Sequence, residues 1–151
     1  MLSEILKELS NSLSIEPLTI NSEGFCSIVI DEKVAIFLQV NSAQEVILYS
    51  NLTLNALEDT SLLNQAILEA NFFGLGANGF TIGMNPKNQQ YIIYRRIYES
   101  GLNVERLELL LNQLVIAIEF WQNILNQPEE FLSSYQTQSD SESHITPFNR
   151  V

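Results

Sequence analysis

Hydrophobic residues recur every three or four positions at the start of the chain. Leu2, Ile5, Leu6 and Leu9 fall on one face of a helix, and polar or charged residues occupy the other. Pro17 cannot continue an α-helix, because it lacks a backbone N–H and its ring clashes with the preceding turn. The spacing therefore predicts a helix that starts near residue 2 and ends before residue 17.

Three short segments rich in aliphatic and β-branched residues follow, over residues 24–30, 34–40 and 45–49. Only short polar turns separate them, which predicts an antiparallel meander. Both faces of this meander are apolar, since neighbours such as Ile36 and Phe37 point in opposite directions. A sheet with one solvated face should alternate cleanly between apolar and polar residues. We therefore expect a helix, a second subunit or a bound chain to cover the second face.

The second half of the chain alternates between helix and strand patterns. We predict a helix near residues 59–73, two strands near residues 80–84 and 90–97, and a long helix over residues 104–125 with Asn103 as its N-cap. The predicted fold class is α+β, in the order helix, three-strand antiparallel meander, helix, two strands, long helix.

A change in composition predicts where the folded domain ends. Pro128 is expected to end the ordered part, because the residues after it are rich in Gln, Ser and acidic side chains. We therefore predict one domain over residues 1–126 and a polar, disordered tail over residues 127–151. A chain of 151 residues fits this division.

Charge and composition narrow the classes of partner. The formal net charge is -11, with 18 acidic and 7 basic residues, which disfavours nucleic acid and anionic membranes. The N-terminal segment has charges within its apolar stretch, so no signal peptide is expected, and no apolar run is long enough to span a bilayer. The single cysteine, Cys26, fits a reducing compartment. These features predict a cytoplasmic protein.

The sharpest apparent chemical motif is a GxGxxG pattern at residues 74–79. In a dinucleotide site this pattern follows a strand and opens a helix, whereas here a predicted helix precedes it and a strand follows. A glycine-rich helix stop and turn is the better interpretation.

Nucleophilic catalysis and metal binding both lack the residues they need. The only histidine, His144, lies in the predicted tail, and Cys26 has no histidine beside it in the folded part. Adjacent carboxylates such as Asp31 and Glu32 are interpreted as solvated or capping groups. We therefore expect no enzyme activity, no metal and no cofactor. A small enzyme that uses carboxylates is a remote third alternative.

The order of predicted elements, with the acidic charge, resembles the class I type III secretion chaperones, the family of the chaperone of the translocated intimin receptor. The match covers residues 2–125, and the ordered set of segments carries it rather than any single motif. The segments that carry the resemblance are residues 23–31, 47–50, 67–73, 79–84 and 91–96, and Phe120-Trp121.

The resemblance implies a homodimer in the bacterial cytoplasm. Such proteins hold the N-terminal region of a secreted effector in an extended, export-competent form, by strand addition and in apolar grooves. Effectors, a second copy of the chain and components of the secretion apparatus are thus the implied partners. A YbjN-like regulatory or protein-binding domain has a similar fold without a tie to secretion, and it remains the main alternative.

Candidate contact residues follow from these implications. Effector contact is assigned to the first helix and the meander, at Ile5, Leu9, Phe25, Ile28, Val34, Ile36, Leu38 and Leu48. The alternative for each is a place in the core, since one face of every strand must be buried. Dimer contact is assigned, by resemblance, to the second predicted helix and the last two strands, at Leu63, Ile67, Phe72, Phe80, Ile82, Ile92 and Tyr94.

Overall fold

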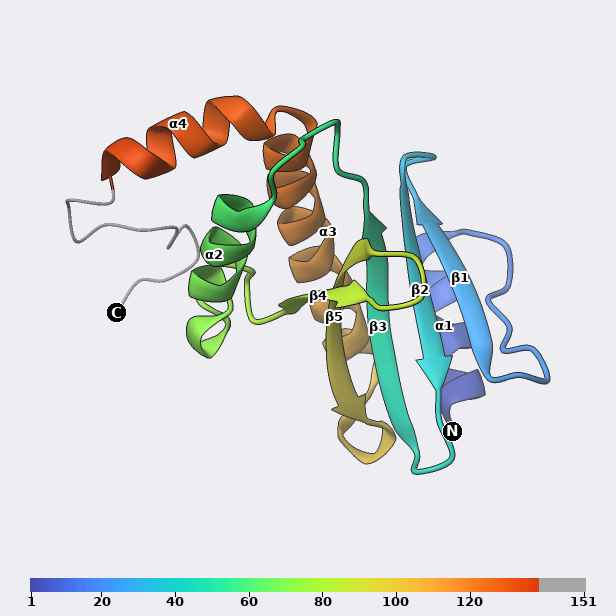
Figure 1. Cartoon of the computed structure of the whole chain (residues 1–151). Coiled ribbons are helices and arrows are strands. Elements are labelled where there is room, and N and C mark those ends of the chain that lie inside the picture. Colours follow the sequence, from blue (N-terminus) through green and yellow to red (C-terminus); the bar gives the residue numbers. More distant parts are fainter. Residues whose placement is uncertain (139–151) are drawn as a thin grey trace. The chain divides into compact units, whose positions relative to one another are not determined.

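A computed structural model describes residues 1–138 of the chain (Figure 1). The fold is α+β, as the sequence predicts, and its strands form one antiparallel sheet in the order β1-β2-β3-β5-β4. The helices are α1 (Leu2–Leu13), α2 (Ser61–Ala70), α3 (Val104–Asn126) and α4 (Pro128–Gln138), with two 3-10 turns, η1 (Phe72–Gly74) and η2 (Glu99–Gly101). The strands are β1 (Phe25–Ile30), β2 (Val34–Val40), β3 (Glu45–Leu52), β4 (Thr81–Asn85) and β5 (Gln90–Tyr98).

The chain divides into two compact units. Unit 1 consists of residues 1–50 and 94–115, and unit 2 consists of residues 51–93 and the chain from residue 116 onward. Unit 1 therefore holds α1, the meander and the first half of α3. Unit 2 holds α2, β4, the second half of α3 and α4.

One face of the meander forms the core of unit 1. Ile28 of β1 lies opposite Ile36 of β2, and Leu38 of β2 lies opposite Leu48 of β3. All four side chains are at most 1% exposed. In Figure 1, α1 lies behind β1 and β2, with its apolar stripe, including the fully buried Leu9, in the core. A helix thus covers one of the two apolar faces.

The glycine-rich segment of unit 2 is a helix stop and turn, which confirms the sequence interpretation. Gly74 and Gly79 have positive φ angles of 71° and 85°, which favour glycine. A Cβ atom added at Gly76 would lie 2.5 Å from the Cβ atom of Ala70, so a larger residue would clash. The indole N–H of the fully buried Trp121 donates to the Gly76 carbonyl oxygen over 2.9 Å.

The chain remains helical after α3, so the prediction that Pro128 ends the ordered part is wrong. Proline suits the first position of a helix, where its missing N–H has no partner to lose, and Pro128 begins α4 in this way. Tyr135 is buried and donates a hydrogen bond from its hydroxyl to Glu69 of α2. The rest of the predicted tail, residues 139–151 with His144, lies outside the described residues.

Candidate partner-binding surfaces

The second face of the meander is apolar and only partly covered. Phe25, Phe37 and Tyr49 form a row across β1, β2 and β3, which we call the aromatic row. Their ring centroids are 5.6 Å apart between the two phenylalanines and 5.3 Å apart between Phe37 and Tyr49. All three side chains are half-buried, and Val29 of β1 is 58% exposed. This face is a surface on which apolar groups of a partner can lie.

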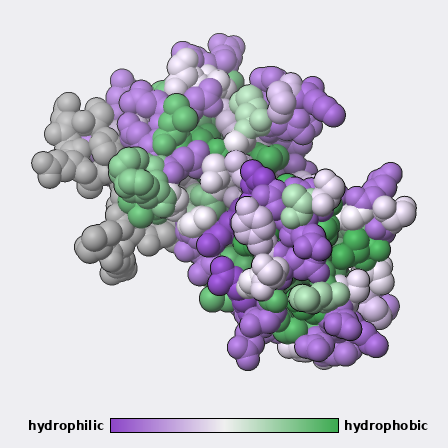
Figure 2. All heavy atoms as spheres, turned by 90° about the horizontal axis from the view of Figure 1, so that it is seen from below, coloured by the Kyte–Doolittle hydropathy of each residue, from purple (hydrophilic) through white to green (hydrophobic). Residues whose placement is uncertain are grey.

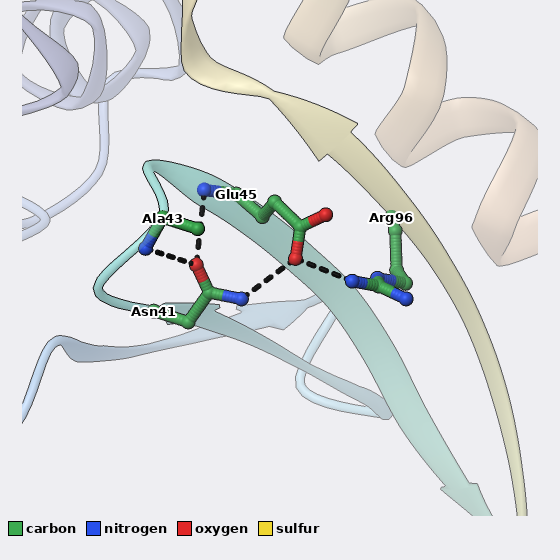
Figure 3. A network of polar contacts seen from close by, with 4 residues as sticks. All are labelled: Asn41, Ala43, Glu45 and Arg96. Carbon is green, nitrogen blue, oxygen red and sulfur yellow. Dashed lines mark hydrogen bonds and ion pairs between the residues drawn. The ribbon is translucent and has the colours of Figure 1, made fainter.

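A polar network joins the turn between β2 and β3 to Glu45 of β3 and Arg96 of β5 (Figure 3). The side-chain oxygen of Asn41 accepts the backbone N–H groups of Ala43 and Glu45, and its amide nitrogen donates to the Glu45 carboxylate. Arg96 pairs with Glu45 across the sheet. The hydrogen bond from Arg96 holds the pKa of Glu45 below its usual range.

Strand β1 lies at an edge of the sheet described for residues 1–138. The backbone N–H of Val40 donates to the Gly24 carbonyl oxygen, so even-numbered residues of β1 direct their backbone groups at β2. Odd-numbered residues direct theirs outward. Asn21 occupies the outward backbone groups of Phe25. Its backbone N–H donates to the Phe25 carbonyl oxygen and its side-chain oxygen accepts the Phe25 N–H, both over 2.9 Å.

The outward backbone groups of Ser27 and Val29 pair with no strand among residues 1–138. Unpaired N–H and C=O groups at the edge of a sheet are a template for the addition of another strand. We call this stretch the open edge.

An apolar groove of about 310 Å³ lies beside the open edge in unit 1. Its walls come from the end of α1, the end of β1 and the first half of α3. The lining residues are Leu13, Ile15, Ile28, Val29, Ile30, Asp31, Glu108, Leu111 and Asn112. Leu13 and Ile15 are 44% and 40% exposed, so the groove opens to solvent. This volume is at the small end of ligand pockets and suits a few side chains of a longer chain.

Most of the predicted effector-contact residues lie in the core. Six of the eight have exposed fractions of 8% or less, namely Ile5, Leu9, Ile28, Ile36, Leu38 and Leu48. Phe25 and Val34 are half-buried. The sequence analysis missed Phe37, Tyr49 and Val29, although the doubly apolar meander was the signal for them. The accessible apolar side chains of the meander thus lie mainly on the face opposite the one that holds most of the predicted contacts.

The predicted dimer residues divide in the same way. Leu63, Ile67, Phe80 and Ile82 are at most 6% exposed, whereas Ile92 and Tyr94 are half-buried. Phe72 is the exposed member of the set.

An exposed apolar patch surrounds Phe72 in unit 2. Leu68, Phe72 and Phe73 are 72%, 63% and 83% exposed, and the two phenylalanine ring centroids are 4.3 Å apart. We call these three residues the α2 patch. Seen from below in Figure 2, hydrophobic surface appears in separate areas between polar side chains. An exposed apolar cluster of this kind typically marks an interface.

The described residues were also searched for a reactive thiol and for metal ligands. Burial raises the pKa of the Cys26 thiol, which disfavours the reactive thiolate. No group of three or more His, Cys, Asp or Glu side chains within residues 1–138 could hold a metal ion. No helix in this range has the length and apolar character required to cross a membrane.

One protein-family model matches most of the chain. A family model described as the Tir chaperone protein (CesT) family matches residues 4–122. No curated protein matches the chain.

Solved structures share the fold at low sequence identity. A chain of the HopA1-SchA chaperone-effector complex has 23% identity and a TM-score of 0.68, over 81% of this chain and 93% of that chain. A chain of the ExsC-ExsE complex has 20% identity and a TM-score of 0.69, over 82% and 92%. A chain of the complex of the Yersinia pestis type III secretion chaperone SycH with a YscM2 fragment has 19% identity and a TM-score of 0.62, over 79% and 98%.

Proposed function

We propose, because the chain belongs to the Tir chaperone protein (CesT) family, that it is a type III secretion chaperone. It binds the N-terminal region of an effector in extended form and keeps it competent for export from the bacterial cytoplasm. Structures of similar fold include a chaperone-effector complex and a type III secretion chaperone, which favours this function over a YbjN-like regulatory domain. The observation that carries the proposal is the half-buried aromatic row beside the open edge of β1.

The two surfaces of unit 1 suit two kinds of contact. The open edge offers backbone hydrogen bonds, which any extended sequence can make. The aromatic row offers apolar area to side chains that would otherwise drive the effector to fold or aggregate. Binding of this kind requires no catalytic group and no cofactor, and we propose that the protein is not an enzyme.

We further propose that the protein is a homodimer. The α2 patch and the half-buried Ile92 support an interface in unit 2, because a monomer seldom leaves such apolar groups without a partner. A two-fold dimer would present two copies of the aromatic row to one effector. Sedimentation at micromolar concentration should give twice the mass of one chain, and a monomer would contradict the proposal.

The chaperone function is tested by capture from the native host. Tagged protein is purified from cells that make the secretion system, and bound chains are identified by mass spectrometry. We expect a secreted effector to be retained by the wild type and lost by Phe37→Asp, which places a charge in the aromatic row. Ser100→Asp adds the same charge at an exposed site of η2 and should retain the effector. Equal capture by both variants, or capture of no secreted chain, would contradict the proposal.

A further inference from the structure

An effector segment that adds to the open edge as a strand, here called the guest, would have each side chain directed to a set face of the sheet. Residues directly opposite each other on neighbouring strands place their side chains on the same face of the sheet. Guest residues opposite Ser27 and Val29 would therefore face the side of the aromatic row. Guest residues opposite Ile28 and Ile30 would face the groove, which both of these residues line. The groove thus receives every second side chain of the guest.

The residues that line the groove are mostly apolar and include two carboxylates. Leu13, Ile28 and Leu111 provide apolar walls, whereas Asp31 and Glu108 provide carboxylates. Asp31 directly follows Ile30, so its carboxylate lies at the Ile30 end of the edge. Glu108 is half-buried and accepts a hydrogen bond from the Ser12 hydroxyl over 2.7 Å.

Neither carboxylate forms an ion pair with another of residues 1–138, and the residues that line the groove include no lysine or arginine. Both carboxylates can therefore pair with a cation of the effector segment. The net charge of -11 would also attract a basic segment during its approach.

We propose that the groove selects an effector segment, added antiparallel to β1, in which an apolar residue is preceded, two positions earlier, by lysine or arginine. The apolar side chain lies opposite Ile28, between Leu13 and Leu111. The basic side chain lies opposite Ile30 and pairs with Asp31 and Glu108. The proposal rests on the proposed chaperone function, and it names the chemistry of the segment that the open edge accepts.

Labelled peptides test this selection directly. Two extended peptides of alternating threonine and valine differ only at the centre, which reads lysine-threonine-leucine in one and glutamate-threonine-leucine in the other. Fluorescence anisotropy gives the Kd of each for the full-length protein. We expect the lysine peptide to bind about fivefold more tightly at low salt, as for a partly exposed ion pair. The preference should weaken as salt screens the charges.

Substitutions of the two carboxylates test whether the preference for the lysine peptide comes from the groove. Asp31→Asn combined with Glu108→Gln keeps side-chain size and the acceptor for Ser12, and it should reduce the preference to about onefold by removing both partners of the ion pair. Glu119→Gln removes an exposed charge of α3 in unit 2 and should leave the preference unchanged.

Equal binding of both peptides to the wild type, or of neither, would overturn the proposal. So would a preference that survives in the double variant. None of these results bears on effector capture by the aromatic row, which is measured separately with Phe37→Asp. The failure of this selection and the failure of the chaperone function are therefore distinguishable.

Discussion

The aromatic row of unit 1 and Trp121 of unit 2 differ in how far the chain itself covers them. In unit 1, Phe25, Phe37 and Tyr49 remain half-buried on a face that no described part of unit 1 closes. In unit 2, Trp121 is fully buried, and Phe131 of α4 approaches it with a ring-centroid distance of 6.5 Å. Unit 1 leaves the aromatic row partly open. Unit 2 covers Trp121 with its own last helix, although it leaves Phe72 and Phe73 exposed.

This difference separates stability from binding. Apolar area that the chain covers itself stabilises the folded state, because its removal from water occurs on folding. Apolar area that stays half-exposed contributes its remaining share only when a partner arrives. Substitutions around Trp121 in unit 2 should therefore change the free energy of unfolding, whereas substitutions on the open face of unit 1 should change affinity for the effector.

The largest expected effect on stability is that of Trp121→Ala. We expect a loss of about 3–5 kcal/mol in the free energy of unfolding, because the change leaves a large cavity and an unpaired Gly76 carbonyl oxygen. Urea denaturation followed by circular dichroism measures it. Phe37→Ala, which removes a half-buried ring from unit 1, should cost clearly less. Similar losses for the two variants would show that the aromatic row is core as well.

Removal of α4 tests whether this helix is what covers Trp121. A chain that ends at Gln127 lacks Phe131 and Tyr135, so Trp121 should become more exposed and its fluorescence emission should shift to longer wavelength. Trp121 is the single tryptophan, which makes the signal specific. A chain that ends at Gln138 keeps α4 and should emit like the full chain. Unchanged emission in the shorter chain would mean that α4 does not shield Trp121.

Val29→Pro tests the open edge without opening the core. The Val29 N–H points away from β2, so proline removes an outward donor and leaves the β1–β2 hydrogen bonds in place. We expect effector affinity to fall by about tenfold, equivalent to one lost hydrogen bond. Titration calorimetry with the captured effector segment measures this. Val29→Thr retains the donor and should bind like the wild type, and equal affinity of the two variants would exclude strand addition here.

The smallest expected effect is a dependence of stability on alkaline pH. Burial, and then the hydrogen bond to Glu69, raise the pKa of Tyr135 to about 12. An unfolded tyrosine ionises near pH 10, so this contribution is complete below pH 10 and is lost as the pH rises through 12. Tyr135→Phe should therefore lose less stability than the wild type between pH 10 and 12. Urea midpoints across this range give the difference, and parallel curves would contradict it.

The sequence predicted the elements well because their patterns are local. Asn103 was identified as an N-cap, and its side-chain oxygen accepts the Arg106 N–H over 2.8 Å. The pairing of strands followed from short turns. These features depend on residues within a few positions of each other, which the sequence displays directly.

The choice of face could not be made from the sequence. Leu38 and Phe37 are neighbours of equal apolar character, and only the packing of α1 decides that Leu38 is buried and Phe37 remains accessible. The helix α4 was missed for a related reason. Its few apolar residues, Phe131 and Tyr135 among them, gain meaning only beside Trp121 and Glu69, which are distant in sequence.

The two hydrogen bonds between Asn21 and Phe25 also limit the register in which a strand can add to β1. They occupy the edge upstream of Ser27, so an incoming segment can pair only from that point onward. A slip by one residue would exchange the side chains that face the aromatic row for those that face the groove. The same closure shortens the stretch of β1 at which two unloaded copies could join edge to edge. One asparagine thereby limits both misregistered loading and self-association before the cargo arrives.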